Sequence, residues 1–188
     1  MRVSVIIRAY NAEKTVTRAV ESAMAQALPR DDFEIIIVDD GSSDRTKDIL
    51  AAYEGASGIR IFHQENKGAL IAANFGFTAS RGEYAVLLDS DDYFEPELTS
   101  ELSRTLDEHP EIDFAYPDYY EEYQGNKKIV SPLNIFETTA AGTMLRRAKL
   151  MEAGAYNPDV KIFYEYDLLL RTLGKWSSFH VPKPLFTY

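Results

Sequence analysis

The stretch that decides the fold is Phe33-Glu-Ile-Ile-Ile-Val-Asp-Asp-Gly-Ser-Ser-Asp44. It begins as a short β-branched apolar run, which is typical of a strand buried on both faces of a parallel sheet. Two aspartates follow, and Gly41 permits a sharp exit from the strand. Ser42 or Ser43 suits the N-cap of a helix that we expect over Asp44–Tyr53. The stretch therefore predicts a strand, an acidic turn and a helix in succession.

The same alternation extends to both sides of this stretch. Strand-like runs are separated by segments of helical period, and Pro29 ends the first of these segments. The predicted strands are Val3–Ile7, Phe33–Val38, Ile59–Phe62 and Tyr84–Leu88, and the predicted helices are Ala12–Ala27, Asp44–Tyr53 and Ala69–Ala79. This order predicts an α/β fold with a mostly parallel sheet, right-handed crossovers and flanking helices.

The second half of the chain is less regular. We expect helices at Pro96–Glu108, Arg146–Ala153 and Tyr164–Leu173, strands at Phe114–Tyr116 and Ser177–Val181, and a hairpin of Tyr119–Tyr123 with Lys128–Val130. No repeat, low-complexity tract or linker interrupts the sequence. We therefore expect a single domain over residues 1–188, with a functional division near residue 95.

The charge of the chain narrows its partners. Its 188 residues carry a net charge of −10, with a pI near 4.8. The acids concentrate between Asp89 and Glu122, where Arg104 is the single Lys or Arg. So acidic a surface repels phosphate backbones and anionic lipid headgroups. Nucleic-acid binding is therefore disfavoured.

Two further properties of the sequence bear on its location. Cysteine is absent, which excludes disulfides, a thiolate nucleophile and Cys-based metal sites. The apolar run after Met1-Arg2 is too short for a signal peptide, and no run approaches about 18 consecutive apolar residues. We expect no transmembrane segment in this chain and a cytoplasmic location, in solution or at the inner face of the membrane.

The sequence Asp89-Ser90-Asp91-Asp92 directly follows the fourth predicted strand. Ligands of such sheets bind outside the carboxyl ends of the strands. Three carboxylates within four residues repel one another unless a cation or strong donors neutralise them. Oxygen ligands without cysteine suit Mg²⁺ or Mn²⁺. The alternative is a solvated acidic turn that caps the helix from Pro96.

The pair Asp39 and Asp40 ends the second predicted strand. Capping of the next helix does not require both, and a carboxylate there can accept hydrogen bonds from a base or a ribose. No Gly-x-Gly-x-x-Gly follows the first strand and no Gly-x4-Gly-Lys-Ser/Thr occurs. A dinucleotide oxidoreductase and a P-loop NTPase therefore lose their main support, and a metal would have to hold any phosphates.

Four motifs in register carry a resemblance over essentially the whole chain. They are Val3-Ser-Val-Ile-Ile-x-x-Tyr10-Asn11, Glu34-Ile-Ile-Ile-Val-Asp39-Asp40-Gly-Ser-Ser-Asp44, Asn66-Lys67-Gly68 and Leu88-Asp89-Ser90-Asp91-Asp92. In order and spacing they resemble the family 2 glycosyltransferases of GT-A fold. The resemblance implies a GT-A-type, Rossmann-like sheet in which residues 1–95 bind a nucleotide-sugar and residues 96–188 form a smaller acceptor-side half.

The resemblance also implies roles for individual residues. Tyr10 and Asp40 would lie near the base and Asp39 near the ribose or base, with Lys67 directed toward the diphosphate. Asp89 and Asp91 form the family's Asp-x-Asp motif; Asp91, with Asp89 and Asp92, would bind Mn²⁺ or Mg²⁺, and Ser90 would contact the donor. The donor would be a nucleoside diphosphate sugar, UDP-linked in preference to GDP-linked. The acceptor, a glycan, a lipid-linked molecule or a small molecule, is not identified.

The catalytic base implied by the resemblance lies on a late helix. Family members often carry Glu-Asp-x-Asp-Leu-x-Leu-Arg there, and this chain reads Tyr164-Glu-Tyr-Asp-Leu-Leu-Leu-Arg171. The base therefore falls on Glu165, while Tyr164 replaces the preceding acid and Asp167 pairs with Arg171. A second departure is Arg8, where the family has Pro or Thr; Arg8 would meet a phosphate or pair with an aspartate. Thr138–Met144 would lie on the acceptor side.

Two other readings stay open. A receiver domain also binds Mg²⁺ with an Asp pair at a strand end, but its pair follows the first strand. A non-catalytic relative that binds a nucleotide-sugar would fit the change at Tyr164. Family members usually continue beyond the position of Tyr188, so we also expect a chain that is cut short at its C-terminus.

Overall fold

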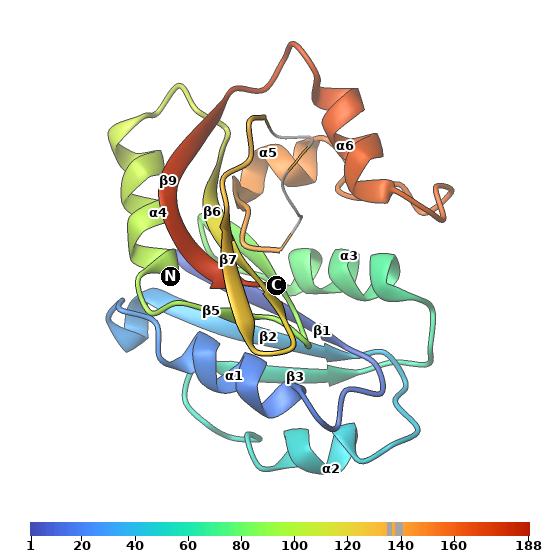
Figure 1. The fold of residues 1–188 in the computed structure, drawn as a ribbon. Helices are drawn as coiled ribbons and strands as arrows, with labels where there is room; N and C mark the ends of the chain where they lie inside the picture. The colour runs from blue at the N-terminus through green and yellow to red at the C-terminus, as the bar shows by residue number, and fades with distance from the viewer. Residues whose placement is uncertain (135–136, 138–140) are drawn as a thin grey trace.

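The computed structural model describes residues 1–134, 137 and 141–188 and arranges them in three layers (Figure 1). The described strands form one nine-stranded sheet in the order β3-β2-β1-β4-β8-β6-β9-β5, with β7 paired to β6. Helices pack against both faces of this sheet. The predicted α/β class with flanking helices is confirmed.

The first half of the chain contributes the parallel part of the sheet. Its strands are β1 (Val3–Ala9), β2 (Phe33–Asp39), β3 (Ile59–His63) and β4 (Tyr84–Asp89), and neighbours pair in parallel. Its helices are α1 (Val16–Met24), α2 (Thr46–Ala51) and α3 (Ala69–Ala79), with a 3₁₀ turn at Arg30–Asp32. The four predicted strands are confirmed, whereas α1 and α2 are shorter than predicted because turns flank them.

The second half makes the sheet mixed. Its strands are β5 (Tyr93–Phe94), β6 (Phe114–Tyr123), β7 (Asn126–Val130), β8 (Met144–Arg146) and β9 (Ser178–Thr187), and its helices are α4 (Leu98–Glu108), α5 (Arg147–Glu152) and α6 (Tyr164–Thr172). β8 pairs antiparallel with both β4 and β6, and β5 pairs antiparallel with β9. β6 pairs in parallel with β9 and antiparallel with β7, so the second half combines both kinds of pairing and the whole sheet is mixed.

Alternation along β1 divides the core between the two faces of the sheet. Val3, Val5 and Ile7 pack with α1, α2 and α4, while Ile6 packs with α3, α5 and α6. Helix α3 lies directly on β1, since a Cβ at Gly76 would come within 2.3 Å of Ile6 Cγ2. This close packing fixes the first turn of α3 beside the ends of β1 and β2.

The helices are short. The longest in the described part of the chain, α3 and α4, have 11 residues each. No helix among the described residues combines the length and the apolar character needed to cross a membrane.

Candidate active site

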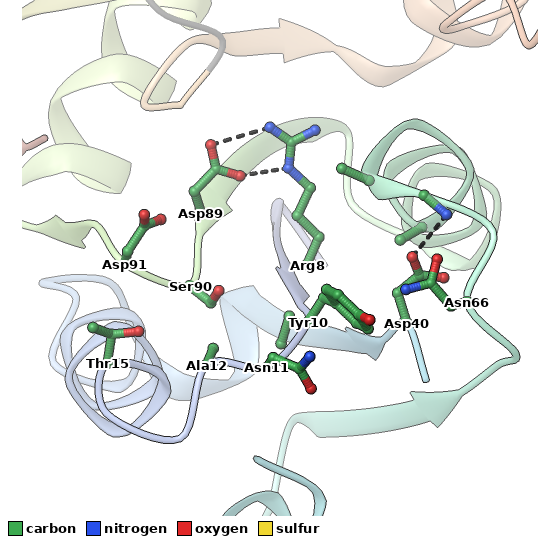
Figure 2. Close-up of a pocket in the computed structure, with 14 residues that line it drawn as sticks. Arg8, Tyr10, Asn11, Ala12, Thr15, Asp40, Asn66, Asp89, Ser90 and Asp91 are labelled. Atoms are coloured by element: carbon green, nitrogen blue, oxygen red, sulfur yellow. Dashed lines mark hydrogen bonds and ion pairs between the residues drawn. The ribbon is translucent and has the colours of Figure 1, made fainter. Parts of the chain in front are cut away.

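A cavity of about 490 Å³ opens at the carboxyl ends of β1, β2 and β4, beside the first turn of α3 (Figure 2). Five of the predicted site residues line it, namely Tyr10, Asp40, Asp89, Ser90 and Asp91. They converge because β2, β1 and β4 are neighbours in the sheet, so their ends share one edge. Four other predicted site residues stand behind or beside this wall: Asp39, Lys67, Asp92 and Glu165.

Asp40 organises the loop that leads into α3. It is only 2% exposed, and its Oδ1 accepts hydrogen bonds from Gln64 Nε2 at 2.6 Å and from the Lys67 N–H at 2.9 Å. Its Oδ2 accepts one from the Gly68 N–H at 2.8 Å. Lys67 thus contributes its backbone to the site, while its side chain is exposed and outside the cavity wall.

We expect Asp40→Asn to lower the free energy of unfolding by about 2 kcal/mol. Three groups now donate hydrogen bonds to the buried carboxylate, and the NH₂ group of an asparagine would face at least one of these donors without accepting its hydrogen bond. The measurement is urea unfolding followed by circular dichroism. Asp31→Asn, on an exposed side chain, is the matched control. Equal unfolding midpoints for the two variants would contradict the structural role of Asp40.

Asp39 is equally buried but contacts protein groups. Its Oδ2 pairs with His63 Nδ1 at 2.9 Å, and its Oδ1 accepts a hydrogen bond from the Ser42 N–H at 3.1 Å. The cavity wall does not include it. Its contact with a base or ribose therefore stays a prediction.

Two loop residues of the site escaped assignment from the sequence. Asn11 lines the cavity with a φ of +49°, and its Oδ1 accepts a hydrogen bond from the Ser43 N–H at 2.8 Å. Asn66 also lines the cavity, and a Cβ at Gly41 would lie 2.7 Å from its backbone nitrogen. Only glycine fits at position 41, where φ is +74°. The Asn next to Tyr10 was a usable signal, since Asn tolerates the left-handed region.

The acids after β4 have three different environments. Asp89 forms a two-point ion pair with Arg8, which donates from Nε and, at 3.1 Å, from Nη2 (Figure 2). Asp91 lines the main cavity and also a neighbouring one of about 310 Å³. Asp92 is 4% exposed, and its Oδ2 has no hydrogen-bond partner among the described residues. Burial and the charges of Asp89 and Asp91 raise the pKa of Asp92 to about 8.

This acidic cluster fits a divalent cation. Within the described ranges no three acids or histidines already surround one point as a complete metal site would. Asp91 and Asp92 nevertheless line the same smaller cavity, and none of the described residues donates a hydrogen bond to the buried Oδ2 of Asp92. Carboxylates that keep open positions beside a cavity are typical of Mg²⁺ or Mn²⁺ sites completed by waters and substrate phosphates.

Helix α6 brings Glu165 next to this cluster. Glu165 Oε1 lies 3.8 Å from Arg8 Nη2, and Arg8 Nη1 donates a hydrogen bond to the Tyr164 hydroxyl. Burial alone would lower the pKa of Arg8, but the charge of Asp89 and the hydrogen bonds outweigh it, and the pKa rises. Asp167 pairs with Arg171 at 2.7 Å, one helical turn later, as the sequence indicated.

The structure describes only part of Thr138–Met144, the segment expected on the acceptor side. Thr138, Thr139 and Ala140 lie outside the described residues. Met144, which ends that segment, lies in β8 and is fully buried in the core.

Curated relatives match part of the chain. The putative glycosyltransferase EpsH of Bacillus subtilis is 35% identical over 127 residues, which cover 67% of this chain and 36% of that protein. WfaP of Escherichia coli, a UDP-Glc:α-D-GlcNAc-diphosphoundecaprenol β-1,3-glucosyltransferase, is 38% identical over 122 residues, which cover 64% of this chain and 47% of WfaP. The chain thus spans less than half the length of these two relatives.

Solved structures share the fold over the whole chain. The structure of residues 1–349 of TarS from Staphylococcus aureus, in complex with UDP-GlcNAc, has a TM-score of 0.85 at 24% identity; the match covers 100% of this chain and 58% of that solved chain. The mannosyltransferase PcManGT of Pyrobaculum calidifontis, in complex with GDP-Man and Mn²⁺, has a TM-score of 0.78 at 17% identity, with 100% and 56% covered. The family model described as "Glycosyl transferase family 2" matches residues 4–167. The chain belongs to glycosyl transferase family 2, with the GT-A fold that its four motifs predicted.

Proposed function

We propose that this chain transfers a sugar from a UDP-sugar to a hydroxyl acceptor, with inversion at the anomeric carbon and with Mn²⁺ or Mg²⁺ bound. The observation that carries this proposal is the cavity that Tyr10, Asp40 and Asp91 line at one edge of the sheet. Glu165 lies next to this cavity, because it contacts Arg8, which also lines it. Family membership and the nucleotide-sugar complexes of TarS and PcManGT support the same reaction class.

The donor would lie across the ends of β2, β1 and β4. Tyr10 is half exposed and offers a ring on which a base can stack. Asp40 and Asp39 would contact the base and ribose, and Ser90 the sugar-phosphate part. The first turn of α3 borders the cavity through Gly68 and Ala69, and a helix N-terminus favours a diphosphate there. Lys67 would reach the diphosphate only if its exposed side chain turned inward.

Asp91 and Asp92 would hold the metal, and Asp89 would support them from its ion pair with Arg8. A divalent ion held by these carboxylates would supply positive charge to stabilise a leaving diphosphate. The protein's own contribution would be to position the metal and the diphosphate next to each other. The carboxylates after β4 lie beside the same cavity as the α3 turn, so both would face one diphosphate.

Glu165 would act as general base on the acceptor side. Its carboxylate takes the proton of the acceptor hydroxyl while the acceptor oxygen forms a bond to the anomeric carbon. The bond from that carbon to the diphosphate oxygen breaks on the opposite face, and its electron pair leaves with the UDP. One displacement with one base inverts the configuration at that carbon.

The two halves of the chain would divide these tasks. Residues 1–95 form the donor half and residues 96–188 the acceptor half of one glycosyltransferase domain. The acceptor would be a glycan, a lipid-linked molecule or a small molecule with a free hydroxyl. A cytoplasmic location, in solution or at the inner face of the membrane, would fit the supply of nucleotide-sugars.

A thermal-shift panel tests the proposal. UDP-GlcNAc, UDP-Glc and GDP-Man are compared with Mn²⁺ and with EDTA. Ligand at a hundredfold Kd adds about 2.7 kcal/mol, and at roughly 2–4 °C per kcal/mol for a chain of this size we expect Tm to rise by about 5–10 °C with one UDP-sugar and Mn²⁺. Release of UDP is then measured with that donor.

Three outcomes would count against parts of this proposal. A chain that no donor stabilises does not bind nucleotide-sugars. An equal shift in EDTA would contradict the metal, because the donor would bind without it. Stabilisation without any release of UDP, with water or simple glycans as acceptors, would indicate a relative that binds the donor and does not transfer it.

A further inference from the structure

We propose that Arg8 and Tyr164 act as a positioning pair, which holds the Glu165 carboxylate at the acceptor side while Arg8 remains paired with Asp89 on the donor side. This inference rests on the proposed function, because it assigns Glu165 the part of the base. It concerns two side chains that are far apart in the sequence and contact each other in the structure.

Arg8 owes its place to the sheet. It lies near the end of β1, and its partner in the β1–β4 ladder is Asp89. Neighbouring positions on parallel strands place their side chains on the same face, so the guanidinium meets the carboxylate edge to edge. The side chain of Arg8 is only 13% exposed. Its fork is therefore fixed before any substrate arrives.

Two donors of the same guanidinium reach α6. Nη1 donates to the Tyr164 hydroxyl, and Nη2 lies 3.8 Å from Glu165 Oε1. The Tyr164 hydroxyl and the Glu165 carboxylate therefore share one partner, the Arg8 guanidinium. By accepting from Nη1, the tyrosine oxygen orients the guanidinium whose Nη2 faces the Glu165 carboxylate. A base that is oriented by a third group is a recurring arrangement in catalytic sites.

The ring of Tyr164 is anchored from behind. It lies 5.0 Å from the ring of Tyr156, which in turn packs 5.7 Å from Phe77 of α3. Asn74 of α3 holds the backbone of Tyr156 with two hydrogen bonds, of 2.7 Å and 3.0 Å. The Tyr164 hydroxyl is thus fixed relative to α3 and β1, the same elements that shape the cavity.

Charge gives the pair a second task. Asp89 and Glu165 are partly buried carboxylates that both face Nη2 of one guanidinium, at 3.1 Å and 3.8 Å, with side chains 28% and 27% exposed. A single cation between two such acids reduces their mutual repulsion. Without Arg8, the two carboxylates would separate, and Glu165 would lose its position beside the cavity.

A double-mutant cycle with Arg8→Lys and Tyr164→Phe tests this inference. Lysine keeps the charge but not the fork, and phenylalanine keeps the anchored ring but not the hydroxyl. We expect kcat for UDP release from UDP-GlcNAc or UDP-Glc with Mn²⁺ to fall about tenfold in each single variant. The double variant should fall no further than Arg8→Lys, because both changes break one unit.

Three further measurements separate positioning from a merely structural role. Calorimetry with UDP and Mn²⁺ should give a Kd for Tyr164→Phe within twofold of wild type, and its Tm should stay within about 2 °C. Tyr166→Phe, the same change two residues further along α6 at an exposed side chain, should keep wild-type kcat. If Tyr164→Phe lost UDP affinity and thermal stability together with kcat, the inference would be overturned.

The remaining outcomes are equally decisive. Losses that multiply in the double variant, or a Tyr164→Phe kcat within twofold of wild type, would overturn the positioning pair while leaving the proposed function intact. A wild-type protein that releases no UDP from either donor would overturn the proposed function first and this inference with it.

Discussion

We expect Asp91→Ala to abolish Mn²⁺-dependent binding of UDP-sugars and to lower turnover by about a thousandfold or more. Asp91 lines both the main cavity and its smaller neighbour, so it stands where a donor and a cation would meet. Asp89 cannot replace it, because both oxygens of Asp89 are bound to Arg8. A thousandfold loss corresponds to about 4 kcal/mol, which lies within the several kcal/mol that a bound metal supplies.

The variant should still fold. Removal of one carboxylate relieves repulsion on Asp92, which is buried without a partner for Oδ2 among the described residues. Binding is measured by calorimetry with UDP-GlcNAc and UDP-Glc, in Mn²⁺ and in EDTA, and turnover by release of UDP. Asp48→Ala, an exposed acid on α2, is the control for the loss of one negative charge. Retention of Mn²⁺-dependent binding within threefold of wild type would remove Asp91 from the metal site.

The parallel half of the fold was predictable from the sequence because its strands are buried on both faces. A run such as Ile35-Ile-Ile-Val38 has one stable environment, and the helices between such runs dictate parallel pairing. The convergence of Tyr10, Asp40 and Asp91 followed from the same rule, since the carboxyl ends of adjacent parallel strands share one edge.

The second half was less predictable for local reasons. Strands β5 and β8 have two and three residues, too few for a periodic signal, and their partners are far away in the chain. Strand β6 was expected as two separate pieces. Pro117 lies in its middle and coincides with a register shift against β9, so the strand continues through a residue that usually ends one.

The partners of Arg8 were open for a different reason. The sequence allowed either a phosphate or an aspartate as the partner of Arg8. The structure identifies Asp89, because β1 and β4 are neighbours in the sheet and Arg8 lies opposite Asp89. The contact with Tyr164 spans 156 residues and depends on where α6 packs. Periodicity and motif spacing carry no information on such contacts, because they describe each segment separately.

We expect Glu165→Gln to bind UDP-GlcNAc or UDP-Glc with Mn²⁺ at wild-type affinity and to lose transfer by roughly 10²–10⁴-fold, the usual contribution of a positioned general base. Glutamine keeps the shape of the side chain and an oxygen that can face Arg8, but its amide cannot take the proton of an acceptor hydroxyl. Arg8 would stay paired with Asp89, so the donor half should be unchanged.

The separation of affinity from rate is what identifies a base. Substitution of a residue that only supports the fold lowers donor affinity and transfer rate together, whereas substitution of a residue that binds the donor mainly lowers affinity. Glu54 is an exposed acid that is not among the candidate site residues. As a control, Glu54→Gln should keep wild-type donor affinity and wild-type transfer. If Glu165→Gln kept more than a tenth of wild-type transfer, another group would have to accept the proton. Asp167 is a poor substitute because it already pairs with Arg171, so such a result would remove Glu165 from the role of base without transferring that role to its neighbour on α6.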